Sequence, residues 1–243
     1  MNKPEFISNV DFEILKSMYP DNMDEVIKKL NNHYPVQYLI GNVNFYGYQI
    51  FVDERVLIPR FETEGLVEET LKLIKFKNIT PKIIEVGTGS GCIAIALSKE
   101  LNTQVTAIDI SKSALEVATK NALYNEANVT FQLKDIKTGD FNSKYNILIS
   151  NPPYVKYDEP VDPATKFEPQ NALFADHNGL EFYEVILKRS HEFMESTNII
   201  AFEIGETQAS EIEILAKKEY PNANVIVKKD LQGRNRYLFV IND

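Results

Sequence analysis

Between residues 82 and 219 the chain alternates short apolar runs with longer segments whose apolar residues recur every three or four positions. Short apolar runs predict buried strands, and the longer period predicts helices. The strands are expected near residues 82–86, 105–109, 129–134, 145–150 and 198–204. The helices are expected near residues 90–100, 112–124, 179–194 and 206–219. This α/β alternation predicts a parallel sheet with right-handed crossovers.

The two ends of the chain follow other patterns. Residues 1–35 predict a short helical region of two helices, with the apolar sets Phe12, Ile14, Leu15, Met18 and Met23, Val26, Ile27, Leu30. Residues 36–62 predict a β-hairpin linker that turns at Gly47. A helix near Thr63 then opens an α/β domain over residues 63–243. Residues 224–227 and 236–240 flank a short polar turn, so the last strand is expected to be antiparallel.

Three glycines follow the first strand of the alternating region. Gly87, Gly89 and Gly91 stand between the run at 83–86 and an Ala/Ile/Leu helix. Glycine lets the backbone turn sharply and approach a ligand closely, and dinucleotide-binding folds use the same strand–loop–helix arrangement. The third glycine of the dinucleotide pattern is replaced here by Cys92. Such a loop alone is weak evidence for a nucleotide site.

An acidic residue strengthens the hypothesis of a nucleotide site. Asp109 ends the second strand, 18 residues after Gly91, where its carboxylate can accept hydrogen bonds from both hydroxyls of a ribose. The alternative is a charge at a helix N-terminus, because Ser111 is a good helix cap. Together with the glycines, Asp109 favours ribose binding.

The segment Ser150-Asn151-Pro152-Pro153-Tyr154 follows the apolar run at 145–149. Proline fixes φ and has no N–H, and it pushes the preceding residue to extended conformations. The Asn151 side-chain oxygen and the Pro152 carbonyl can therefore form a rigid fork of two acceptors. Such a fork suits a planar –NH2 group. The simpler interpretation is a strand that ends in a turn.

All these features fall at the carboxyl ends of predicted parallel strands, where open α/β sheets bind their ligands. Asp135 and Ile136 follow the third strand, where they could bind an adenine amine and pack against its ring. A solvated loop acid is an equally good interpretation of Asp135. Residues 152–177 form a loop of a length that is often functional.

Composition narrows the class of protein. The 243 residues are 44% hydrophobic, with a net charge of −9 and a pI near 5.0. This charge argues against a broad phosphate-neutralising surface, so direct nucleic-acid binding is not expected. Cys92 is the single cysteine and is expected to be a buried filler, which fits a reducing compartment. We expect a cytoplasmic protein with no membrane association, no metal and no evident general base, since His177 and His191 have no obvious partner.

The Gly87–Gly91 loop, Asp109 and the Asn-Pro-Pro-Tyr segment resemble a class I S-adenosylmethionine-dependent methyltransferase that acts on a planar nitrogen. The flanking sequence resembles the HemK-type release factor glutamine methyltransferases, almost without a break over residues 35–240. The similar segments are residues 35–41, 45–47, 56–64, 167–173, 179–183, 203–205 with Gln208, and 230–236. Two features depart from that pattern. Phe61 replaces a proline, and the N-terminal helical region has about half its usual size.

The resemblance implies a Rossmann-like, seven-stranded sheet with an antiparallel last strand. It implies methyl transfer from S-adenosylmethionine to the glutamine of the Gly-Gly-Gln motif in class I peptide chain release factors. The candidate cofactor-binding residues are Gly87, Thr88, Gly89, Ser90, Gly91, Asp109, Asp135, Ile136 and Asn151. Asn151, Pro152 and Tyr154 are the candidate catalytic residues, and with Pro153 they would hold the glutamine amide, Tyr154 walling the pocket.

Three alternatives remain at this point. An adenine methyltransferase on DNA or ribosomal RNA could use the same fork, with Tyr154 stacking on a flipped base. A non-catalytic protein could bind a nucleotide or a partner, although such a protein would not need the glycine loop, Asp109 and the fork at Asn151 together. A nicotinamide dehydrogenase is disfavoured by Cys92 at the third glycine position.

Overall fold

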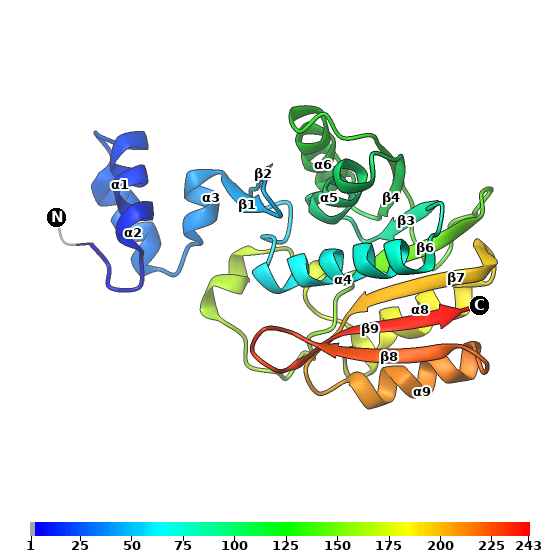
Figure 1. Cartoon of the computed structure of the whole chain (residues 1–243). Coiled ribbons are helices and arrows are strands. Elements are labelled where there is room, and N and C mark those ends of the chain that lie inside the picture. The colour runs from blue at the N-terminus through cyan, green and yellow to red at the C-terminus, as the bar shows by residue number, and fades with distance from the viewer. Residues whose placement is uncertain (1–2) are drawn as a thin grey trace.

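The computed structural model describes residues 3–243, and its centre is a seven-stranded mixed sheet (Figure 1). The strands are β3 (Ile83–Val86), β4 (Val105–Asp109), β5 (Val129–Leu133), β6 (Tyr145–Ser150), β7 (Met194–Glu203), β8 (Asn224–Lys229) and β9 (Asn235–Asn242). Their order across the sheet is β5-β4-β3-β6-β7-β9-β8. The last strand, β9, runs antiparallel between β7 and β8. This confirms the predicted Rossmann-like sheet with its antiparallel last strand.

Helices cover both faces of the sheet because alternate strand residues point to opposite sides. On one face, α4 (Phe61–Lys77), α5 (Cys92–Leu101) and α6 (Lys112–Tyr124) pack against Ile83 and Ile147. On the other face, α8 (Glu181–Ser190) and α9 (Ala209–Glu219) pack against Ile84 and Leu148. β4 and β6 flank β3, so the chain reverses its direction of winding at β3. Ligand sites form at such a switch point.

The N-terminal helices α1 (Asn9–Met18), α2 (Met23–Asn31) and α3 (Val36–Ile40) stand to one side of the sheet in Figure 1. The buried residues of α1 and α2 form a cluster with Leu39 of α3, whereas Tyr38 of α3 belongs to the core on one face of the sheet. Phe12 and Leu15 belong to this cluster, but Ile14 and Met18 are 38% and 47% exposed. The expected single apolar face of α1 is therefore wrong for Ile14 and Met18, because only the side that carries Phe12 and Leu15 meets a neighbour.

A two-stranded hairpin links the N-terminal helices to α4. Its strands are β1 (Asn42–Phe45) and β2 (Tyr48–Phe51), which turn through Tyr46 and Gly47 at positive φ. The buried side chain of Asn121 on α6 exchanges two hydrogen bonds with the backbone of Phe51 and donates a third to the Ser90 carbonyl. The hairpin is thus fixed beside the glycine loop. The short α3 was not expected, because five residues carry too little periodicity to identify a helix.

The predicted long loop contains three short turns of helix, η1 (Pro163–Phe167), η2 (Gln170–Ala172) and α7 (Asp176–Gly179). The helix expected over 179–194 ends earlier, at Ser190, and β7 begins at Met194 and not near residue 198. The reason is that Phe193 and Met194 are buried in the sheet's core, and Tyr145 pairs with Met194. No helix within residues 3–243 is both long enough and apolar enough to cross a bilayer.

Candidate active site

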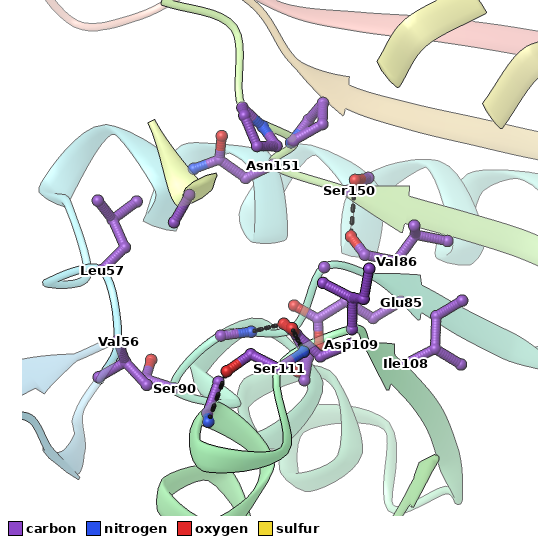
Figure 2. A pocket seen from close by; sticks show the side chains of 18 of the residues that line it. Val56, Leu57, Glu85, Val86, Ser90, Ile108, Asp109, Ser111, Ser150 and Asn151 are labelled. Atoms are coloured by element: carbon purple, nitrogen blue, oxygen red, sulfur yellow. Dashed lines mark hydrogen bonds between the residues drawn. The ribbon is translucent and has the colours of Figure 1, made fainter. Parts of the chain in front are cut away.

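A cavity of about 310 Å³ opens at the carboxyl ends of β3, β4 and β6. Its size lies within the usual range of small-molecule sites, about 300–1,000 Å³. Figure 2 shows Asn151 across the cavity from Asp109 and Ser111, with Val56 and Leu57 on a third side. The sequence-predicted residues that line it are Gly87, Thr88, Gly89, Ser90, Asp109, Asp135, Ile136, Asn151, Pro152 and Pro153. Gly91 and Tyr154, also predicted as site residues, do not line it.

The glycine loop forms the floor of the cavity. Gly87 and Gly89 have φ of +74° and +54°, and a Cβ at either position would project into open space. A side chain at either position would therefore be strained and would occupy room that a ligand could use. Gly91 differs, because a Cβ there would lie 3.1 Å from the Cβ of Ala118 on α6. Gly91 allows α5 and α6 to pack closely behind the loop.

Asp109 supports the loop at the end of β4. Its Oδ2 accepts a hydrogen bond from the Gly89 amide at 2.9 Å, and its Oδ1 accepts one from the Ser111 amide at 2.8 Å. Ser111 in turn caps α6 through the Ala114 amide, as its sequence position predicted. Burial raises the pKa of Asp109, although these backbone hydrogen bonds oppose the shift. Each carboxylate oxygen keeps a further lone pair for a ligand.

Asp135 and Ile136 line the cavity after β5. Ile136 is largely buried, and the part of its side chain that lines the cavity offers an apolar surface to a flat ring. The Asp135 carboxylate accepts a hydrogen bond from the Lys137 amide at 2.8 Å, within its own turn. Both sequence interpretations of Asp135 are therefore compatible with its position.

Glu85 is a site residue that the sequence reasoning missed. It lies on β3 just before the loop, is 1% exposed and lines the cavity. Its Oε2 accepts hydrogen bonds from the Thr88 hydroxyl and the Ala94 amide, while Oε1 has no partner within residues 3–243. Burial raises the pKa of this carboxyl to about 8. A charged residue inside the otherwise apolar run Ile83-Ile84-Glu85-Val86 could have identified it.

Asn151 and Pro152 lie at the end of β6, on the opposite side of the cavity from Asp109. The Asn151 Nδ2 donates a hydrogen bond to the Thr63 hydroxyl at 3.2 Å. Within residues 3–243, no group donates to the Asn151 Oδ1 or to the Pro152 carbonyl. Two acceptors on a stiff segment are therefore available to a ligand, as the sequence predicted.

Tyr154 turns away from the cavity. Its hydroxyl approaches the buried Glu203 carboxylate at 3.4 Å, and the Gln208 side chain donates a hydrogen bond to its carbonyl at 3.0 Å. The expected wall position of Tyr154 is therefore not observed. The ring instead packs with the core that includes Tyr183 and Phe202.

The wall formed by residues 55–60 was also not predicted as part of the site. Glu168 holds this segment in place, because its buried carboxylate accepts hydrogen bonds from the Ile58 amide at 3.0 Å and from Arg60 at 2.6 Å. The partners lie 110 and 108 residues apart in the chain. No local pattern could have paired them.

His177 and His191 lie outside the cavity but are paired, contrary to expectation. His177 contacts Glu184 at 2.8 Å, and His191 contacts Glu219 at 3.5 Å. Cys92 is buried, and burial raises the pKa of its thiol to about 12, as suits a structural filler. Among residues 3–243 we find no cluster of three side chains suited to a metal ion.

The cavity fits a nucleoside-containing ligand. The open space above Gly87 and Gly89 leaves room for a part of the ligand that lies directly against the loop backbone. The Asp109 carboxylate suits ribose hydroxyls, and the buried Oε1 of Glu85, which has no partner within residues 3–243, is free to form a hydrogen bond with a polar group of the ligand. The Asn151 Oδ1 and the Pro152 carbonyl receive no hydrogen bond within residues 3–243, so residues that line the cavity offer two acceptors to a group with N–H donors.

Comparisons with known proteins agree with this geometry. The family described as "Methyltransferase small domain" matches residues 66–167. A release factor glutamine methyltransferase from Flavobacterium psychrophilum is 38% identical, over 96% of this chain and 86% of its own. One from Streptococcus pneumoniae is 36% identical, over 97% of this chain and 85% of its own.

Solved structures show the same fold at low sequence identity. A methyltransferase from Pyrococcus furiosus matches 92% of this chain and 98% of its own, with a TM-score of 0.59 and 16% identity. A 16S rRNA methyltransferase from T. thermophilus, solved with AdoMet and guanosine, matches 83% of this chain and 50% of its own. Its TM-score is 0.61 and its identity 11%.

Proposed function

Because the chain belongs to the release factor glutamine methyltransferases, we propose that it methylates the glutamine side chain in the Gly-Gly-Gln motif of class I peptide chain release factors. The methyl donor is S-adenosylmethionine and the acceptor is the amide nitrogen. The observation that carries this proposal is the pair of free acceptors at Asn151 and Pro152, on the far side of the cavity from the glycine loop. An –NH2 group offers the two N–H donors that such a pair requires.

We assign the cofactor to the cavity floor. Gly87 to Ser90 would follow its methionine part, Asp109 would bind the ribose, and Ile136 would pack against the adenine. Asp135 stays a candidate for the adenine amine. When bound, S-adenosylmethionine supplies a methyl group on a sulfonium, which is electrophilic without further activation. Gly91 supports the loop from behind through its packing on α6.

Asn151 and Pro152 would prepare the substrate nitrogen. An amide nitrogen is a poor nucleophile because its lone pair is delocalised into the carbonyl. Two acceptors on its N–H groups hold it in place and stabilise the positive charge that develops there. Prolines 152 and 153 stiffen the segment, so little reorganisation is needed during the reaction. Tyr154 would help to hold this segment in place from outside the cavity, through the contact of its hydroxyl with Glu203.

The test is incubation of the purified protein with labelled S-adenosylmethionine and purified release factors, followed by mass mapping of the product. We expect the label on the glutamine of the Gly-Gly-Gln motif. Parallel reactions contain DNA and ribosomal RNA. Label on adenine in those reactions, with none on the release factor, would replace the proposal by the nucleic-acid alternative. Cofactor binding with no methyl transfer to any of these substrates would favour a non-catalytic protein.

Asn151→Ala separates the fork from the cofactor site. We expect methyl transfer to fall by about 100- to 1000-fold, as when one key polar contact to a transition state is lost. Cofactor affinity, measured by calorimetry, should stay within a few-fold. Full activity of Asn151→Ala at saturating cofactor would discard the fork.

The partner and the compartment follow from the same proposal. The partner is a release factor, with no direct role for nucleic acid or a membrane. The net charge of −9 agrees with a protein substrate and not with a phosphate backbone. The single buried cysteine is consistent with the cytoplasm, where release factors act.

A further inference from the structure

The proposed reaction needs the oxygen of the Asn151 side chain, and not its nitrogen, to be available to the substrate. The two ends of a side-chain amide have nearly the same shape, so packing distinguishes them poorly. Hydrogen-bond partners must decide which end is free. The Asn151 Nδ2 has such a partner, the Thr63 hydroxyl at 3.2 Å.

Thr63 lies in the first turn of α4 and is 3% exposed. Its hydroxyl has a single proton, and the Oγ1 donates it to the Glu203 Oε2 at 2.7 Å. Only lone pairs remain on Oγ1 for a second neighbour. The end of Asn151 that faces Thr63 must therefore be a donor, which is Nδ2, and Oδ1 is left free.

Glu203 ends β7 and is 2% exposed. Its Oε2 accepts a hydrogen bond from the Thr63 hydroxyl, and its Oε1 accepts one from the Tyr154 hydroxyl at 3.4 Å. Burial raises the pKa of Glu203, while the nearby Arg236 guanidinium on β9 and the two hydroxyl donors lower it. Arg236 is itself held by Asp230, with 3.3 Å between Nε and Oδ2. Glu203 Oε2 accepts from the Thr63 hydroxyl, and that hydroxyl accepts from Asn151 Nδ2, so the hydrogen bonds run in one direction from Asn151 to Glu203.

We propose that Thr63 and Glu203 are positioning residues that fix the orientation of the Asn151 amide, so that its oxygen stays available to the substrate nitrogen. The proposal rests on the methyl transfer proposed above. Glu203 also contacts Tyr154, so one buried carboxylate steadies both polar side chains of the Asn-Pro-Pro-Tyr segment. Without this chain of hydrogen bonds the amide could turn over and present Nδ2, a donor, to a substrate group that also donates.

The hydrogen bonds from Asn151 through Thr63 to Glu203 form a relay, and kinetics on Thr63 variants test it. Thr63→Val should lower kcat for release factor methylation by about 10- to 100-fold, the range for one lost positioning hydrogen bond. The KM for the release factor and the cofactor affinity should change by less than about three-fold, because the orientation matters in the transition state. Thr63→Ser keeps the hydroxyl and should restore most of kcat. Glu203→Gln should lower kcat in the same way, since its amide can donate to Thr63.

Thr70→Val is the matched control. Thr70 is a buried threonine on the same helix, and within the described part of the chain its hydroxyl bonds only to the Leu66 carbonyl. The same chemical change there should leave kcat within about two-fold, since no positioning contact is lost. If Thr63→Val behaves like Thr70→Val, the proposal is overturned.

A second comparison separates positioning from general destabilisation. In an Asn151→Ala background the relay has nothing left to orient, so adding Thr63→Val should lower the rate by less than about two-fold. An equal fold loss with and without Asn151 would show that Thr63 acts structurally, against the proposal.

A spectroscopic readout keeps this test independent of activity. The side-chain amide protons of Asn151 can be assigned in ¹⁵N–¹H spectra of the ligand-free protein from their loss in Asn151→Ala. In the wild type we expect two well-separated resonances, one of them protected from exchange by its bond to Thr63, and in Thr63→Val we expect that difference to collapse. Identical spectra would overturn the relay. Failure of the wild type to methylate release factors would instead overturn the proposed function and leave this readout valid.

Discussion

At the scale of single residues, buried acids distinguish this site. Asp109, Glu85 and Glu203 are three carboxyl groups at or near the cavity whose pKa values are raised by burial. Each accepts hydrogen bonds from the chain, so each shapes the backbone or the side chains around it. Asp109 and Glu85 also line the cavity, where their roles can be measured separately.

Asp109→Ala removes a candidate ribose contact and the support of the Gly89 amide together. We expect the affinity for S-adenosylmethionine to weaken by about 10- to 100-fold, from one or two lost charge-assisted hydrogen bonds. Calorimetry measures the effect. Asp140→Ala, which removes an exposed acid outside the cavity lining, is the control for lost charge. Unchanged affinity in Asp109→Ala would refute the ribose role.

Glu85 predicts a pH dependence of stability. Its folded pKa of about 8 lies above the ordinary value of 4.5, so the folded chain keeps a proton that the unfolded chain has lost between these pH values. The free energy of unfolding should therefore fall as pH rises through this window, by about 1.4 kcal/mol per pH unit from this group. Urea unfolding at pH 5, 6.5 and 8, without cofactor, measures it.

Glu85→Gln is the comparison, because its side chain cannot titrate. We expect its stability to vary less than that of the wild type between pH 5 and 8. Parallel curves for the two proteins would mean that Glu85 does not hold its proton in the folded state.

At the scale of elements, the Asn-Pro-Pro-Tyr segment is held from behind by the turn that α7 (Asp176–Gly179) forms. His177, Asn178 and Gly179 all have positive φ, so the backbone makes a tight left-handed turn there. The Gln208 side chain donates to the carbonyls of Tyr154 and Asn178 and thereby joins this turn to the segment. A Cβ on Gly179 would lie 2.1 Å from the Tyr154 carbonyl oxygen. Only glycine fits at this contact.

Gly179→Ala should therefore displace the catalytic segment. We expect a loss of about 2–4 kcal/mol in the free energy of unfolding, from left-handed strain plus overpacking, and a fall in methyl transfer. Gly233→Ala is the control, since its φ is also +81° but a Cβ there meets open space. It should lose only about 1–2 kcal/mol, from strain alone, and keep its activity. Equal losses in the two variants would show that the contact with Tyr154 is unimportant.

At the scale of the whole molecule, the helices α1 and α2 have a core separate from the two cores that sandwich the sheet, while α3 contributes Tyr38 to one of those two. On α1 the side away from that core exposes Val10, Ile14 and Met18. Among the described residues, 3–243, those that line the cavity begin at Arg55. The division into residues 1–35, 36–62 and 63–243 stays a prediction, and it can be tested through the separate core.

Leu15→Ala should loosen the N-terminal helices without affecting the cofactor site. Leu15 is fully buried in the N-terminal cluster, so the truncation should cost about 2–5 kcal/mol there. Hydrogen exchange should accelerate in α1 and α2 but not in β3 to β6, and cofactor affinity should stay within about two-fold, since Leu15 is not among the residues that line the cavity. Faster exchange throughout the sheet would contradict a separate N-terminal unit.

The sequence by itself determined the sheet and its rim. Alternating strand and helix patterns, the three glycines and the two prolines act over a few neighbouring residues, so their consequences could be predicted from local rules. The placement of Asp109 and Asn151 on one rim of the sheet followed from the same rules, because Asp109 ends one parallel strand and Asn151 directly follows another.

Tertiary structure decided which side chains meet. Thr63 and Asn151 lie 88 residues apart, and Thr63 and Glu203 lie 140 apart. The contacts of Tyr154 with Glu203 and of Glu168 with Arg60 likewise join residues that lie 49 and 108 positions apart. These contacts depend on how whole helices and strands pack against one another, and burial then fixes the direction of each hydrogen bond. No pattern within a single segment of the chain carries that information.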